Sequence, residues 1–258
     1  MPFADVNGIR MHYERQGSGI PVLLVTGLAG TAAFWTRTAQ LLGEGFDIIA
    51  VDNRGSGLTE CEGEFTIQDM ARDAVALLEH LQVGPAHVVG WSMGSHIALN
   101  LSAERPDLVR SLTLISSYLE RTARAAYILE VIGRAYEKGE VREEVAGAMM
   151  NVLLRTEGYF ESAERTGRPI RTAELGERSG MIRQMRAVSG YSIVDDARRL
   201  RVPVLSVHGL EDIMTPPRCG DELAAEIRGC EVLRIPGEGH IIRPETYVPA
   251  MLDFFKNH

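Results

Sequence analysis

The sequence predicts an α/β fold built on a mostly parallel, doubly wound sheet that carries an all-helical insertion. Short, continuously apolar segments alternate with helical patterns from the start of the chain to residue 117. Between residues 118 and 200 only helical patterns occur, and the alternation returns over residues 201–258. Segments that are apolar on both faces are typical of parallel strands covered by helices on two sides. We therefore expect residues 1–117 and 201–258 to form one core, with residues 118–200 as a helical cap.

The first half of the chain begins with a predicted hairpin. Alternating runs flank Asn7-Gly8, a dipeptide that tolerates the positive φ angles of a type I′ turn. Apolar runs and helical spacing then predict the remaining elements in order. The strands are expected at residues 22–25, 46–51, 87–89 and 112–115, and the helices at residues 31–42, 65–81 and 95–103.

The insertion and the second half follow the same criteria. Three apolar stripes at helical spacing lie within residues 125–136, 145–153 and 181–188. After residue 200 we expect strands at 202–207 and 231–235, with helices near 217–227 and 244–255.

The composition is that of a soluble globular chain with a full core. The 258 residues are 45% apolar and 24% charged, which excludes disorder. With 27 basic and 35 acidic residues the formal net charge is −8, so no nucleic-acid partner is expected. The insertion is nearly neutral, with 14 basic and 13 acidic residues, whereas the remainder carries 13 and 22.

The cysteines and the first residues bear on the cellular compartment, and the uncharged runs bear on whether the chain spans a membrane. Cys61, Cys219 and Cys230 are odd in number and lack C-x-x-C spacing, and the first residues resemble no secretion signal. Both observations favour a reducing, cytoplasmic setting. Two uncharged runs, residues 16–36 and 80–103, are broken by Gly and Pro, so no membrane span is expected.

One motif carries chemistry. Gly90-Trp91-Ser92-Met93-Gly94 matches G-x-S-x-G, between a predicted strand and a predicted helix. A serine on such a sharp turn is forced toward positive φ, and side chains at the two glycine positions would collide across the turn. The pattern predicts an exposed Ser92 hydroxyl at a helix N-terminus, positioned as a nucleophile.

A serine nucleophile needs a base and an orienting carboxylate. His240 directly follows the strand predicted at 231–235, and Asp212 directly follows the strand predicted at 202–207. Open α/β sheets place their chemistry at these C-terminal strand ends. We therefore expect Ser92, Asp212 and His240 to form a catalytic triad. His96, four residues past Ser92, is a rival base, and Glu211 is a rival acid.

The chain resembles the α/β-hydrolase superfamily over essentially its whole length. The segment from Asp52 to Gly57 is similar to the D-x-R-G-x-G loop of that family, and the opening residues and helical cap resemble 3-oxoadipate enol-lactonases and related esterases. The resemblance implies an oxyanion hole formed by the backbone N–H groups of Leu28 and Met93. Two positions depart from the family: Thr26 stands where His is usual, and Ser95 where a second Gly is common.

The resemblance implies a serine hydrolase that cleaves a small carboxylic ester or lactone without a cofactor or metal. Hydrolysis of a carbon–carbon bond by the same triad stays open, as does a ligand receptor of this fold. Arginines of the insertion, among them Arg124, Arg134, Arg155, Arg183 and Arg186, would either grip a substrate carboxylate or pair with neighbouring acids. Apolar faces of the insertion would serve the pocket or contacts in a homo-oligomer.

A dinucleotide-binding oxidoreductase is the alternative from another class. One segment resembles a Rossmann unit: it has a strand at 22–25, then Gly27 and Gly30, and then Asp52 after the next strand. The first glycine of G-x-G-x-x-G is missing, because Val25-Thr26 stands before Gly27.

A histidine base makes the activity depend on pH. Histidine ordinarily has a pKa of about 6.5, and only its neutral form can accept the serine proton. We predict that kcat/KM on an ester falls in acid, with a midpoint roughly between pH 5.5 and 7. Initial rates across this range measure the midpoint, and a rate that stays flat down to about pH 4 contradicts a histidine base.

Overall fold

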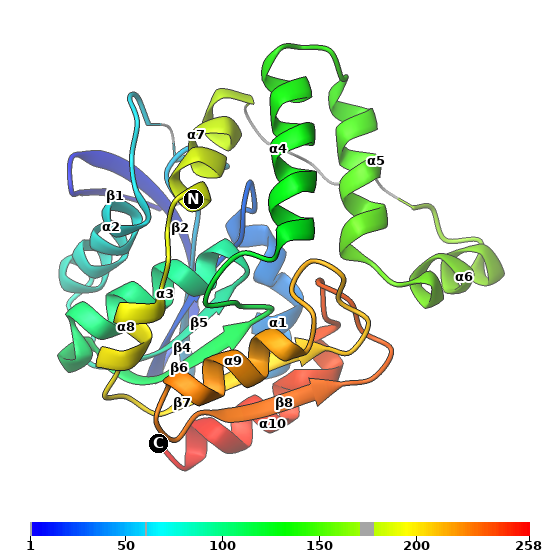
Figure 1. Cartoon of the computed structure of the whole chain (residues 1–258). Helices are drawn as coiled ribbons and strands as arrows, with labels where there is room; N and C mark the ends of the chain where they lie inside the picture. Colours follow the sequence, from blue (N-terminus) through cyan, green and yellow to red (C-terminus); the bar gives the residue numbers. More distant parts are fainter. Residues whose placement is uncertain (1, 60, 171–177) are drawn as a thin grey trace.

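The computed structural model describes residues 2–59, 61–170 and 178–258. Within these residues the strands form one sheet in the order β1-β2-β4-β3-β5-β6-β7-β8 (Figure 1). The strands are β1 Phe3–Val6, β2 Ile9–Gly17, β3 Ile20–Val25, β4 Phe46–Val51, β5 Ala86–Trp91, β6 Val109–Ile115, β7 Val204–Gly209 and β8 Glu231–Ile235. The α-helices are α1 Thr36–Leu42, α2 Ile67–His80, α3 Met93–Glu104, α4 Ala123–Glu137, α5 Glu143–Leu154, α6 Glu157–Thr166, α7 Arg178–Ser189, α8 Val194–Arg199, α9 Arg218–Glu226 and α10 Pro244–Lys256.

The sheet is mostly parallel, as predicted. From β4 through β3 and β5 to β8 every neighbouring pair is parallel, whereas β1 and β2 pair antiparallel and β2 joins β4 antiparallel. The predicted hairpin connects β1 to β2, and Asn7 and Gly8 have φ angles of 45° and 78°. Both central residues therefore have the positive φ that a type I′ turn requires.

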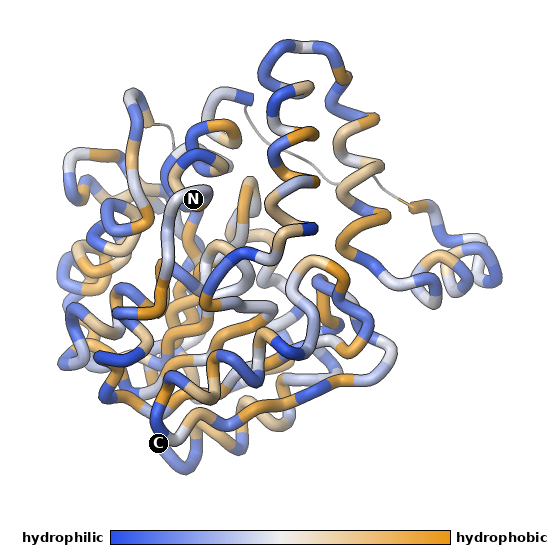
Figure 2. Tube along the Cα trace, viewed as in Figure 1, coloured by the Kyte–Doolittle hydropathy of each residue, from blue (hydrophilic) through white to orange (hydrophobic). Residues whose placement is uncertain are grey.

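Two apolar layers cover the sheet. On β3, Val22 and Leu24 pack with α1 and α10, while Leu23 and Val25 pack with α2 and α3. Burial on both faces explains why the central strands read as continuous apolar runs. Figure 2 shows hydrophobic segments running through the middle of the body. Of the helices that the structure describes, none combines the length and apolar character that a membrane crossing requires.

One predicted helix is divided. The helix expected at residues 31–42 begins as a 3-10 turn, Ala32–Trp35, before α1 starts at Thr36. Trp35 is buried, and the neighbouring Phe34 ring stacks on Trp91 with 4.4 Å between ring centroids. Aromatic packing against the sheet therefore fixes this first turn in the tighter geometry.

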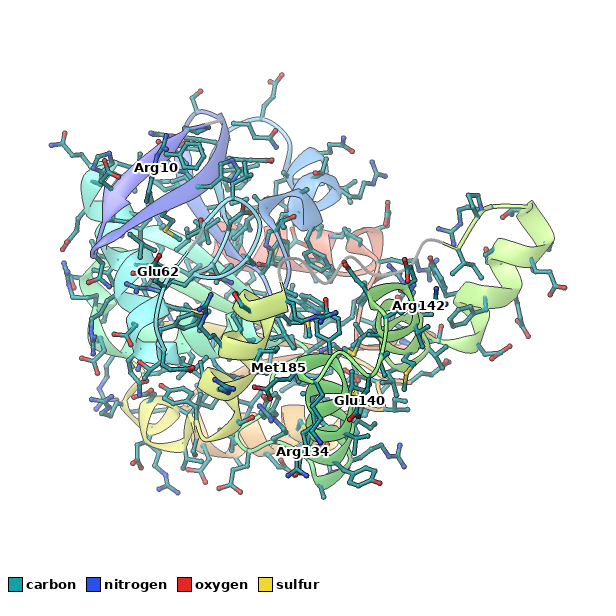
Figure 3. The ribbon with its side chains drawn as sticks, turned by 90° about the horizontal axis from the view of Figure 1, so that it is seen from above. Arg10, Glu62, Arg134, Glu140, Arg142 and Met185 are labelled. Carbon is teal, nitrogen blue, oxygen red and sulfur yellow. The ribbon has the colours of Figure 1, made fainter. Side chains whose placement is uncertain are left out.

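The insertion is helical, as predicted, over the residues described. Helices α4, α5 and α7 lie at the upper side of Figure 1 and α6 lies at its right edge, and the view from above in Figure 3 shows α7 beside α4. Helix α8 packs on α3 of the body, where the Asn100 amide donates to the Asp196 carboxylate at 2.9 Å. The division into a core and a separate cap over residues 118–200 stays a prediction.

Candidate active site

Ser92 lies at the sharp turn between β5 and α3. Its backbone has φ 53° and ψ −120°, a strained conformation for a residue with a side chain. A Cβ on Gly90 would lie 2.4 Å from the Gly94 carbonyl oxygen, and a Cβ on Gly94 would lie 2.2 Å from the Val25 carbonyl oxygen. These separations are far below contact distance, so both positions require glycine. The predicted strain at Ser92 and the predicted collisions are both present.

Ser95 stands where related proteins often have a second glycine. Its hydroxyl is fully buried and lies 2.5 Å from the Ser92 carbonyl oxygen and 2.7 Å from the Ser117 hydroxyl. The side chain therefore links the first turn of α3 to the end of β6. This departure adds a hydrogen-bonded support beneath the Ser92 turn.

The structure brings the three predicted side chains together. His240 Nε2 lies 2.9 Å from Ser92 Oγ, and His240 Nδ1 lies 2.8 Å from Asp212 Oδ2. An ionised carboxylate only accepts hydrogen bonds, so Nδ1 carries the ring proton and Nε2 accepts from the Ser92 hydroxyl. Asp212 and His240 are buried, and Ser92 is partly exposed.

The Asp212 carboxylate is held by its own turn. The backbone N–H groups of Met214 and Thr215 donate to Oδ1 at 2.7 and 2.9 Å, and the Thr215 hydroxyl donates to Oδ2 at 2.5 Å. Burial by itself would raise the pKa of Asp212, but the neighbouring His240 and these hydrogen bonds outweigh burial and hold the pKa below its usual value. A lowered pKa favours the ionised form of the carboxylate beside His240.

The backbone of His240 is fixed from the sheet. Its carbonyl oxygen accepts from Trp91 Nε1 at 2.9 Å and from the Ser116 hydroxyl at 2.8 Å. Sequence reasoning missed Trp91, Ser116 and Thr215 as contributors to the site. The position of Thr215 three residues after Asp212 suits a local turn, and that spacing was a usable signal. Nothing local to Trp91 or Ser116 indicates their contact with a residue more than 120 positions away.

The candidate oxyanion donors lie at the ends of two adjacent strands. Leu28 follows β3 and Met93 opens α3, and neither backbone N–H donates a hydrogen bond to the part of the chain that the structure describes. A Cβ on Gly27 would lie 3.2 Å from the Ser92 Cβ, so this loop runs against the serine. Thr26 is buried and its hydroxyl donates to the Gly30 carbonyl at 3.1 Å, which closes the loop.

The loop that begins at Asp52 supports the loop that contains Leu28. Asp52 is buried, and its carboxylate accepts from the Ala32 N–H at 2.7 Å and from the Leu58 N–H at 2.8 Å. The Arg54 guanidinium forms a two-point ion pair with the Asp73 carboxylate on α2, at 2.5 and 2.7 Å. The loop resembling D-x-R-G-x-G is thus tied to the body on both sides.

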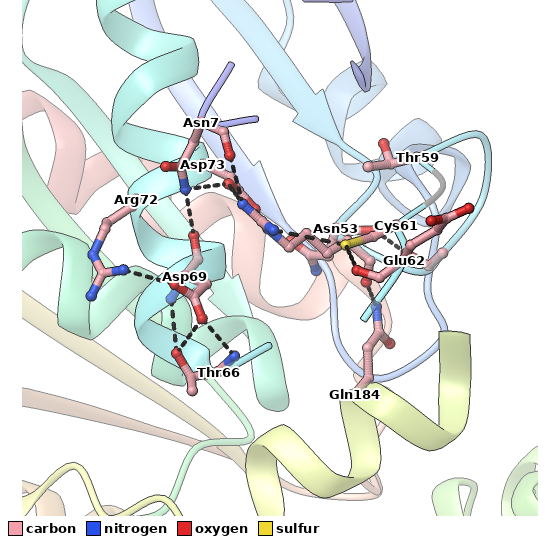
Figure 4. Close-up of polar contacts among 12 residues, drawn as sticks. Asn7, Asn53, Thr59, Cys61, Glu62, Thr66, Asp69, Arg72, Asp73 and Gln184 are labelled. Carbon is pink, nitrogen blue, oxygen red and sulfur yellow. Dashed lines mark hydrogen bonds and ion pairs between the residues drawn. The ribbon is translucent and has the colours of Figure 1, made fainter. Parts of the chain in front are cut away.

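Gln184 joins the insertion to both loops. It lies on α7, is fully buried, and its Oε1 accepts from the Ala29 N–H at 2.8 Å. Its Nε2 donates to the Arg54 carbonyl oxygen at 2.7 Å, and Figure 4 shows the side chain reaching from the helix to the loop. One side chain therefore sets the position of α7 relative to the residue next to Leu28.

The rival site residues lie elsewhere. His96 is fully buried and contacts the Tyr118 carbonyl oxygen through Nε2 at 3.1 Å, and burial lowers its pKa to about 3. His208 contacts the Ser206 hydroxyl at 2.8 Å, and burial lowers its pKa to about 4. Glu211 is exposed, whereas Asp212 beside it is buried against His240. In the described residues, no group of three or more His, Cys, Asp or Glu side chains is arranged to hold a metal ion.

A cavity of about 850 Å³ opens between the insertion and the body. Its floor includes Leu28, Trp91 and Ile241, which are a candidate oxyanion donor and the chain neighbours of Ser92 and His240. Its walls come from the insertion and are largely apolar: Leu129, Ile132, Met150, Leu154, Met181 and Met185, with Arg155, Tyr159 and Arg168 at the polar side. A pocket next to a hydroxyl, imidazole and carboxylate in series suits acyl transfer from a small substrate.

The parallel sheet, the strained serine turn and the helical insertion define an α/β hydrolase. Residues 20–245 match the alpha/beta hydrolase fold family, and the chain belongs to that family.

Individual proteins resemble the chain over nearly their whole length. BpoC of Mycobacterium tuberculosis H37Rv, which carries the provisional name non-heme bromoperoxidase, is 29% identical over 256 residues, with 96% of this chain and 98% of BpoC covered. Its crystal structure superposes with a TM-score of 0.82. The enol-lactonase from Burkholderia xenovorans LB400 is 22% identical, with a TM-score of 0.89 and coverage of 99% and 100%.

A thermophilic esterase from Thermogutta terrifontis is 23% identical, with a TM-score of 0.87 and coverage of 100% of this chain and 99% of the esterase. The enol-lactonase and the esterase share the fold of this chain.

The link through Gln184 predicts a specific kinetic effect. Gln184→Met leaves the Ala29 N–H and the Arg54 carbonyl without partners in a buried place, which we expect to cost about 1–3 kcal/mol of stability. Because the loop next to Leu28 then loses its support, kcat on an ester should fall at least about tenfold with little change in KM. Steady-state kinetics well below the unfolding temperature measure both constants.

Leu77→Ala is the matched control for lost stability. Leu77 lies on α2, is fully buried and makes none of the hydrogen bonds of the site, and its truncation should cost a comparable amount, about 2–5 kcal/mol. Its kcat should stay near the wild-type value. Equal kcat in Gln184→Met and the wild-type chain contradicts a positioning role for Gln184.

Proposed function

We propose that this chain is a serine hydrolase that cleaves a small carboxylic ester or lactone through an acyl-enzyme. The observation that carries the proposal is the continuous series of contacts from Ser92 Oγ to His240 Nε2 at 2.9 Å and from His240 Nδ1 to Asp212 Oδ2 at 2.8 Å. The enol-lactonase and esterase among the similar structures support the choice of bond.

The proposed reaction begins with proton transfer. His240 Nε2 takes the Ser92 proton as Oγ attacks the substrate carbonyl, and Asp212 stabilises the imidazolium that forms. The backbone N–H groups of Leu28 and Met93 receive the negative charge that develops on the carbonyl oxygen. His240 then returns the proton to the departing alkoxide, which leaves an ester between Ser92 and the acyl group.

The second half releases the acid. His240 takes a proton from water as the water oxygen attacks the acyl carbonyl, and it returns that proton to Ser92 Oγ as the ester bond breaks. In a lactone the leaving alkoxide stays on the acyl chain, so the single product is a hydroxy acid or its keto form. The mostly apolar cavity wall favours a small, partly apolar acyl or alcohol group.

Substitution of the proposed nucleophile and base tests the reaction. Ser92→Ala and His240→Ala should each lower kcat by roughly 10⁴-fold, and the double variant should be no worse than either alone because the two groups act as a unit. Aryl esters of increasing acyl length and a panel of lactones provide the substrates. Near-wild-type rates in either variant contradict the proposal.

His80→Ala is the control for removal of a histidine. His80 is exposed at the end of α2, so its loss should leave kcat and KM unchanged.

A further inference from the structure

The polar side of the cavity is built around Tyr159 of α6. The Arg155 guanidinium carbon lies 4.1 Å from the Tyr159 ring centroid, and the Arg168 guanidinium carbon lies 4.8 Å from the same centroid. All three side chains line the cavity next to Ser92. Two guanidinium groups on one aromatic ring concentrate positive charge at a single place in an otherwise apolar wall.

Neither guanidinium has a carboxylate partner among the residues that the structure describes. Arg155 is only partly exposed, and its Nε is buried without a hydrogen-bond partner in this part of the chain. Burial lowers the pKa of Arg155, and the Arg168 charge acts in the same direction. The nearby Glu238 is engaged elsewhere, because its carboxylate accepts from Arg243 Nε at 2.5 Å and from the Arg243 N–H at 3.1 Å. A partly buried cation without a carboxylate partner is costly, so the arrangement suits an incoming anion.

Two other arginines of the insertion have carboxylate partners. Arg134, labelled in Figure 3, pairs with Glu130 on its own helix, and Arg186 pairs with Glu64 and Glu137. Neither of them lines the cavity next to Ser92.

The backbone holds Arg155 at a fixed place relative to the base. The Ile241 N–H donates to the Leu154 carbonyl oxygen at 3.0 Å, directly beside His240. A Cβ on Gly239 would lie 3.1 Å from that same carbonyl oxygen, so the two segments are in close contact. The Arg155 N–H in turn donates to the Asn151 carbonyl at the end of α5, at 3.0 Å. Arg155 therefore belongs to the segment that packs on the His240 loop.

We propose that Arg155 and Arg168 form a carboxylate-binding subsite, so that the substrate is an ester or lactone bearing a free carboxylate away from its reacting carbonyl. The proposal rests on the proposed hydrolase function and narrows it to acidic substrates. The planar guanidinium of Arg155 binds one carboxylate through two parallel hydrogen bonds, and Arg168 adds a second charge from the exposed side. The carbonyl of the same molecule then lies at Ser92.

Paired substrates test the charge requirement. We compare monomethyl glutarate, adipate and pimelate with the methyl esters of the corresponding monoamides, which have nearly the same shape without the charge. In the wild-type chain, kcat/KM should favour at least one acid over its amide by about 10- to 100-fold, mainly through KM. In Arg155→Gln this ratio should fall to near one, and in Arg155→Lys it should be intermediate because the planar donor pair is lost.

Arg134→Gln is the matched control, since it removes the same charge from an exposed position on α4 and should leave the ratio at the wild-type value. A wild-type ratio near one, or an unchanged ratio in Arg155→Gln, overturns the subsite. Thermal unfolding of each variant checks that the fold is intact, and Arg155→Lys serves if Arg155→Gln does not fold.

Binding separates this proposal from the hydrolase function. Calorimetry on Ser92→Ala, which cannot form the acyl-enzyme, should show monomethyl adipate binding at least about tenfold more tightly than its amide. The difference should vanish in the Ser92→Ala, Arg155→Gln double variant. If neither ester is hydrolysed but this difference is present, the subsite stands and the hydrolase proposal fails. If the amide ester is hydrolysed and the acid is not preferred, the hydrolase proposal stands and the subsite fails.

Discussion

The strained backbone of Ser92 is the constraint on which the rest of the site depends. A residue with φ 53° and ψ −120° costs of the order of 1–3 kcal/mol and persists only where its surroundings leave no alternative. Here β5 lies between β3 and β6 in the sheet, and α3 must start immediately after it. Gly90 and Gly94 allow the backbones to approach within distances that no side chain permits. The turn then directs the serine side chain away from the sheet and toward the loop of His240.

The site is completed by contacts between segments that are far apart in sequence. Trp91 and Ser116 fix the carbonyl of His240 from the ends of β5 and β6, while Thr215 fixes Asp212 from its own turn. Among its contacts with the body, the insertion is joined to both loops of the site. Gln184 holds α7 to the loop of Leu28, and the Leu154 carbonyl holds the end of α5 to the loop of His240. Movement of the insertion would therefore displace the loop of Leu28 and the loop of His240 together.

The sequence alone predicted the fold and the close approach of Ser92, Asp212 and His240, because each of these predictions depends on local signals. Apolar runs mark buried parallel strands, and chemistry-bearing residues directly after them share one edge of the sheet. The 3-10 turn before α1 was missed because the packing of Phe34 on Trp91 has no local signal. Gln184 was missed for the same reason, since a glutamine in a helical segment normally faces solvent. Composition could not separate Arg155 from the other arginines of the insertion, because the distinction lies in which of them line the cavity.

The central claim is that the Ser92 hydroxyl is activated by His240, and covalent labelling tests it most directly. A fluorophosphonate reacts with an activated serine and adds one phosphonyl group, which mass spectrometry locates by fragmentation of the tryptic peptide spanning residues 73–110. This peptide also contains Ser95 and Ser102, which provide internal controls. The account predicts a single label on Ser92 in the wild-type chain and a strongly reduced rate of labelling in His240→Ala. An unlabelled Ser92, or a label that forms as fast without His240, would contradict it.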